Sequence, residues 1–79
     1  MDNGQKFRSI VSTILQIPEH EITDDLSSET IDTWDSLNHI NLIGAIEQEF
    51  GLTLDASTLS QFQSIFKLKA MLAEHGVSV

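Results

Sequence analysis

The residue best suited to carry chemistry is a serine at the start of an expected helix. Ser36 follows Asp35, a favourable N-cap residue, and opens a segment with apolar side chains at helical spacing. The unpaired N–H groups and the dipole of a helix N-terminus attract anions, so a phosphodiester on the Ser36 hydroxyl would be stabilised there. A lone Asp-Ser-Leu tripeptide is more often a simple helix cap, so its surroundings have to decide.

Projection of residues 36 to 50 as a helix separates Ser36 from the face that forms the core. At about 100° per residue, the core face holds four apolar side chains. They are Leu42, Ile43, Ile46 and Phe50. A small semi-apolar patch, made of Leu37, Ile40 and Gly44, lies on the side near Ser36. Carboxylates flank this patch at Asp35, Glu47 and Glu49. We therefore expect an exposed serine beside a surface that can receive a partner protein.

Two other kinds of site are considered and set aside. His39 lies three residues after Ser36, but the projection places it at the edge of the core face, and no glycine-rich oxyanion loop is near. A Ser-His hydrolase is not expected, and no catalytic residue is predicted. The acids of residues 24 to 32 lack the glycine and the spacing of a calcium loop. We predict no metal site beyond weak, nonspecific cation binding.

The elements that must position Ser36 follow from the periodicity and the helix stop signals. Helices are predicted at about residues 3 to 16, ended by Pro18, and 36 to 50, ended by Gly51. A last helix begins at Ser64, with Ile65, Leu68 and Leu72 facing inward and Gly76 just past its end. The prediction is one all-α domain, residues 1 to 79: a small four-helix bundle of three main helices and one short one.

Two connecting segments complete this bundle. Residues 19 to 35 show no periodicity and form a long loop between the first two helices, pinned to the core by isolated apolar residues. These are Ile22, Leu26, Ile31 and Trp34. We also predict a short helical turn that holds Leu59 and Phe62, with Asp55 or Ser57 as its cap. Phe62 and Phe66, four residues apart, are interpreted as core residues, with partner or membrane contact as the lesser alternative.

Charge restricts the possible partners. The net charge is −8, and residues 9 to 66 contain ten acids and no Lys or Arg. Such a surface repels nucleic acid and anionic lipid and attracts proteins with basic patches. The absence of cysteine excludes disulfides and thiolate metal sites. The polar N-terminus and the lack of a long apolar run predict no signal peptide and no membrane span, so a cytoplasmic location is expected. We also expect a monomer.

Taken together, these features resemble the acyl carrier proteins over nearly the whole chain. The resemblance rests on the Asp35-Ser36-Leu37 motif, the helix that follows it, the acidic loop before it and the Ser64-Ile65 start of the last helix. It implies that a phosphopantetheinyl transferase moves 4′-phosphopantetheine from coenzyme A to Ser36, and that the arm's thiol carries acyl thioesters. Asp35 and Leu37 match the motif that the transferase reads. Partner docking is expected at Ile40, Asn41, Gly44 and Glu47.

Departures from the family pattern indicate a specialised carrier. Asn38 and Asn41, expected on the solvent side of the helix, replace the usual acids, and Gly44 replaces a larger apolar residue. Trp34 is bulkier than the residue common before the motif. Acyl-loading and acyl-processing enzymes with basic patches are the expected partners, in fatty-acid, polyketide or related synthesis. The alternative is an unmodified interaction module that has the carrier fold and docks through the acidic helix.

Overall fold

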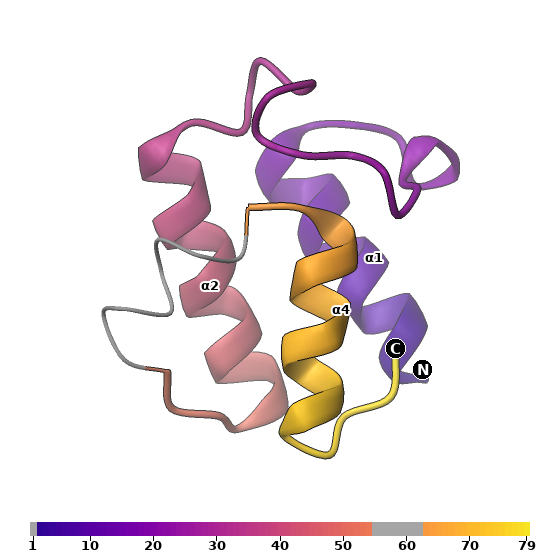
Figure 1. The fold of residues 1–79 in the computed structure, drawn as a ribbon, viewed down its shortest axis with the longest axis vertical. Helices are drawn as coiled ribbons and strands as arrows, with labels where there is room; N and C mark the ends of the chain where they lie inside the picture. Colours follow the sequence, from indigo (N-terminus) through magenta and orange to yellow (C-terminus); the bar gives the residue numbers. More distant parts are fainter. Residues whose placement is uncertain (1, 55–62) are drawn as a thin grey trace.

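The computed structural model describes residues 2–54 and 63–79, and within these ranges the protein is helical, without strands. Three α-helices are present, together with a single 3-10 turn, η1, at Glu19–Glu21. The helices are α1 (Asn3–Leu15), α2 (Ser36–Phe50) and α4 (Ile65–Glu74), which pack together beneath the long loop that joins α1 to α2 (Figure 1). The predicted all-α class is confirmed for these residues. The short helix expected near Leu59 and Phe62 lies outside the described residues.

Helix α1 is fixed by its two ends and by one apolar face. The Asp2 carboxylate caps its start by accepting a hydrogen bond from the Gln5 N–H at 2.7 Å. Phe7, Val11 and Leu15 are fully buried at helical spacing. Leu15 is the last helical residue, one residue before the predicted end at residue 16. Gln16, two residues before Pro18, then takes a left-handed conformation (φ 58°).

Helix α2 has the predicted bounds because both of its ends are specified by sequence. Asp35 is the N-cap, and Gly51 ends the helix in the left-handed region (φ 67°), where a residue without Cβ is favoured. The Gly51 and Leu52 N–H groups both donate to the Glu47 carbonyl. The buried residues of α2 are His39, Leu42, Ile43 and Ile46.

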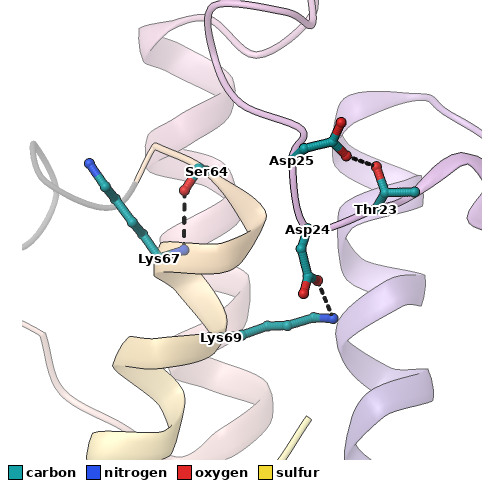
Figure 2. Close-up of polar contacts among 6 residues, drawn as sticks. All are labelled: Thr23, Asp24, Asp25, Ser64, Lys67 and Lys69. Atoms are coloured by element: carbon teal, nitrogen blue, oxygen red, sulfur yellow. Dashed lines mark hydrogen bonds and ion pairs between the residues drawn. The ribbon is translucent and has the colours of Figure 1, made fainter.

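Helix α4 begins against the long loop, which supplies its missing hydrogen-bond partners. The Ile65 N–H donates to the Leu26 carbonyl at 3.0 Å, and the Phe66 N–H donates to the Asp24 carbonyl at 3.2 Å. The Lys67 N–H is capped by the Ser64 hydroxyl at 3.1 Å (Figure 2). These contacts satisfy the first donors of α4, which have no partner inside the helix.

An ion pair reinforces the same contact between loop and helix. The Lys69 ammonium lies 2.7 Å from the Asp24 carboxylate, and the neighbouring Asp25 accepts a hydrogen bond from the Thr23 hydroxyl (Figure 2). Further along the loop, Ser27 and Ser64 form an antiparallel bridge. The loop between α1 and α2 is therefore bound to the beginning of α4.

The core collects the inner faces of the three helices and the end of the loop. Its fully buried side chains come from α1, α2 and α4, with Trp34 from the loop at 3% exposure. Ile22, Leu26 and Ile31 pack against this core, so the prediction of a loop pinned by apolar residues is confirmed. Phe66, by contrast, is 64% exposed, and its assignment to the core is wrong. The inward face of α4 is set by residues 65, 68, 71 and 72, and Phe66 lies about 100° away from Ile65 around the helix.

Candidate functional site

Ser36 is the first residue of α2, and its side chain is exposed. The residue before it holds the helix start in place. The Asp35 carboxylate accepts a hydrogen bond from the Asn38 N–H at 2.9 Å, and the Asp35 carbonyl accepts from the His39 N–H at 2.8 Å. Within residues 2–54 and 63–79, the Ser36 hydroxyl has no hydrogen-bond partner. The hydroxyl is thus free to react, while Asp35 alone performs the capping.

The first turn of α2 also retains unused backbone donors. Among the described residues, no acceptor forms a hydrogen bond with the backbone N–H group of Ser36 or of Leu37. The first turn of α2 contains no acidic residue, and its N-cap is Asp35. Unpaired N–H groups at the positive end of a helix dipole stabilise a phosphate group. This end of α2 therefore offers hydrogen-bond donors and an exposed position for a phosphodiester linked to Ser36.

The predicted docking residues lie along the exposed side of α2, with one exception. Leu37 is 68% exposed and Ile40 is 54% exposed, so two large apolar side chains lie beside Ser36. Asn41 and Gly44 are also exposed, and no described heavy atom lies within 4 Å of a Cβ placed on Gly44. Glu47 is only half-exposed, because its carboxylate accepts a hydrogen bond from the Leu54 N–H at 2.8 Å. Glu47 holds the chain that follows α2, a role that the sequence did not reveal.

Asn38 does not project into solvent, and this prediction is wrong. Its side chain is half-buried, and its amide Nδ2 donates to the Thr33 carbonyl at 2.7 Å. The Thr33 hydroxyl in turn donates to the Leu15 carbonyl at the end of α1, at 2.6 Å. Asn38 therefore turns back from the first turn of α2 and ties the loop end to it.

A second and more deeply buried contact joins a residue before Ser36 to a residue after it. The Trp34 indole N–H donates to His39 Nδ1 at 3.0 Å, and the two rings stack with centroids 6.2 Å apart. Because Nδ1 accepts this bond, the proton of the neutral ring lies on Nε2, which is buried without a partner among the described residues. Leaving a buried donor unsatisfied costs about 1–3 kcal/mol.

This contact also decides the role of His39. The ring is 5% exposed and is bonded to Trp34, whereas the Ser36 side chain points into solvent, so the two do not form a nucleophile pair. The prediction that His39 lies at the edge of the core face is wrong: at about 100° per residue it falls between Ile46 and Phe50, and the structure buries it. The Trp34–His39 bond was missed. The signal available was a tryptophan and a histidine five residues apart across a helix start.

The remaining acids form no ligand set in the part of the chain that the structure describes. No group of three or more His, Cys, Asp or Glu side chains gathers there in an arrangement that holds a metal ion. Asp24 is paired with Lys69, and Asp25 is bonded to Thr23. None of the described helices is both long enough and apolar enough to cross a membrane.

Comparison with known families adds the observation that decides the class of protein. The model of the family described as "Phosphopantetheine attachment site" matches residues 5–72, from the first turn of α1 to the last turn of α4. The chain belongs to this family. Its members carry a 4′-phosphopantetheine prosthetic group and are carriers, not catalysts. No curated protein matches the chain.

The described residues of this phosphopantetheine carrier fit the group. An exposed hydroxyl and two unpaired N–H groups occupy the same helix start, and the phosphodiester would lie on a surface open to solvent. The predicted resemblance to a phosphopantetheine-binding carrier is confirmed.

Proposed function

We propose that this chain is an acyl carrier protein whose Ser36 bears the 4′-phosphopantetheine arm. The observation that carries the proposal is the start of α2, where an exposed hydroxyl and two backbone N–H groups have no hydrogen-bond partner in the part of the chain that the structure describes. The terminal thiol of the arm supplies the chemistry, since it holds an acyl group as a thioester. The protein itself contributes the attachment point, the hydrogen bonds around the phosphate and the surface on which partner enzymes dock.

The serine at the start of α4, Ser64, is a poor alternative. Ser64 is half-buried as the N-cap of α4, and its hydroxyl already accepts the Lys67 N–H. The first two N–H groups of α4 are taken by loop carbonyls at Leu26 and Asp24. A phosphate on Ser64 would have to displace these bonds, whereas a phosphate on Ser36 would displace no hydrogen bond among the described residues.

The surface around Ser36 supports docking by basic enzymes. Leu37 and Ile40 offer exposed apolar contacts, and Asn41, Gly44 and Glu47 extend the same side of α2. With a net charge of −8, the protein attracts basic patches at long range. We propose a phosphopantetheinyl transferase and acyl-processing enzymes as the partners. The neutral Asn41 and the small Gly44 favour a specialised pathway over the general fatty-acid cycle.

The test is modification in vitro. The purified protein is incubated with coenzyme A and a broad-range phosphopantetheinyl transferase, and the product is measured by intact mass and peptide mapping. One phosphopantetheinyl group is expected, on Ser36. Ser36→Ala should keep its helical circular dichroism, because Asp35 still caps α2, and should gain no mass.

Ser64→Ala is the matched control. It loses a helix cap worth about 1 kcal/mol but should still receive one group. Modification of Ser36→Ala, or mapping of the group to another residue, would overturn the assignment. Absence of any mass gain in the unaltered protein would instead support an unmodified interaction module.

A further inference from the structure

Side chains that follow Ser36 in the first turn of α2 bond to residues that precede it. Asn38 binds the Thr33 carbonyl at 2.7 Å, and His39 Nδ1 accepts the Trp34 indole N–H at 3.0 Å. Ser36 lies between these partners in sequence, two residues after Trp34 and three before His39. The hydroxyl is therefore presented by a backbone segment that is bonded on both sides.

The Trp34–His39 contact is not what packing alone would select. Both side chains are buried, at 3% and 5% exposure, yet His39 Nε2 has no partner among the described residues. Two apolar side chains of similar shape would fill the same space without a buried, unsatisfied donor, and such replacements are nearly neutral or stabilising. A directional bond in this place fixes a geometry that apolar packing would leave loose.

We infer that His39 is a positioning residue for the modification of Ser36, acting through its bond to Trp34. The inference rests on the proposed function. In that reaction the Ser36 Oγ forms a bond to the phosphorus that bears the pantetheine of coenzyme A. The bond from that phosphorus to the remaining nucleotide breaks, adenosine 3′,5′-bisphosphate departs, and the hydroxyl proton passes to a base of the transferase. In-line attack needs a defined direction of the Cα–Cβ bond at Ser36, which the Trp34–His39 bond helps to set.

The position of the pair predicts a particular kinetic signature. Neither ring reaches the surface, so neither can contact the transferase, and the exposed Leu37 and Ile40 remain available for docking. Loss of the bond should leave the docking equilibrium in place and lower the fraction of complexes in which the hydroxyl is aligned. The expected effect is a lower kcat for arm transfer with little change in KM.

The experiment compares variants that distinguish the effect of losing the Trp34–His39 hydrogen bond from the effect of losing stability. His39→Asn places an amide oxygen near the position of Nδ1 and keeps an acceptor for Trp34, while His39→Leu has similar size and no acceptor. The double variant Trp34→Phe, His39→Leu replaces the bond by an apolar pair and removes the buried donor. Each protein is tested with coenzyme A and the transferase for kcat and KM, and by thermal melting.

We expect the double variant to melt no lower than the unaltered protein and yet to lose about tenfold in kcat, with KM within about twofold. His39→Leu should be similarly slow, and His39→Asn should retain kcat within about twofold of the unaltered protein. Equal kcat in His39→Asn and His39→Leu would overturn the inference, as would an unaltered kcat in the double variant. Ser36→Ala serves as the blank. Transfer of the arm to this variant would refute the proposed function, whereas the kcat values of the His39 variants test the role of His39.

Discussion

Replacing Gly44 by alanine should stabilise the protein, because the glycine weakens an exposed position inside a helix. Gly44 is the ninth residue of α2, and a Cβ added there meets no described heavy atom within 4 Å. The change therefore has no steric cost within the described part of the chain and gains the helix propensity of alanine over glycine, about 1 kcal/mol. For a domain of this size, that gain corresponds to a rise of about 4–8 °C in melting temperature.

The matched control is the glycine that ends the same helix. Gly51 also has no described atom within 4 Å of an added Cβ, but its φ of 67° lies in the left-handed region. Gly51→Ala should therefore lose about 1–2 kcal/mol for backbone reasons alone. Thermal melts and urea titrations followed by circular dichroism measure both variants. A destabilised Gly44→Ala would refute the reasoning, since it would mean that the space beside residue 44 is needed by another part of the chain.

Three further measurements test the surface of the protein. Phe66→Ser should change the free energy of unfolding by no more than about 0.5 kcal/mol, because Phe66 is exposed. Leu68→Ala, in the core, should lower it by about 2–5 kcal/mol, and chemical denaturation measures both variants. Asn41→Glu should speed acyl transfer by a generic fatty-acid enzyme at low salt, with the gain fading as salt rises; equal rates at low salt would show that Asn41 does not limit steering. Moderate salt should raise the melting temperature because the net charge is −8, and a flat titration would show that repulsion is not limiting.

Much of the helical framework was predictable because it depends on local sequence. Asp35 and Gly51 specify both ends of α2 by side-chain capping and by a left-handed backbone, and the helix has the predicted bounds. Ser64 likewise predicts the start of α4. The exposure of Ser36 followed from the angle between the serine and the apolar face, which depends only on helix geometry.

The contacts that cross between segments were not predictable in the same way. Periodicity places Asn38 on the outer side of α2, but it does not reveal that the Thr33 carbonyl lies within reach of its amide. The pairing of Trp34 with His39 depends on the direction in which the loop enters the helix. Phe66 was misassigned because a spacing of four residues from Phe62 indicates a shared helical face only when both residues belong to one helix, and α4 begins at Ile65.

The difference between the starts of α2 and α4 explains why the loop matters to function. Both helices have an N-cap side chain that accepts the N–H of the third helical residue, Asn38 in α2 and Lys67 in α4. In sequence both starts offer a residue suited to N-capping, Asp35 in one and Ser64 in the other. At the start of α4, backbone carbonyls of the loop accept hydrogen bonds from the first N–H groups of the helix. At the start of α2, Thr33 and Trp34 of the loop bond instead to side chains of the first turn. Among the described residues, the loop thereby holds α2 while leaving its first two N–H groups free, and this division supports our proposal that Ser36, and not Ser64, bears the phosphodiester.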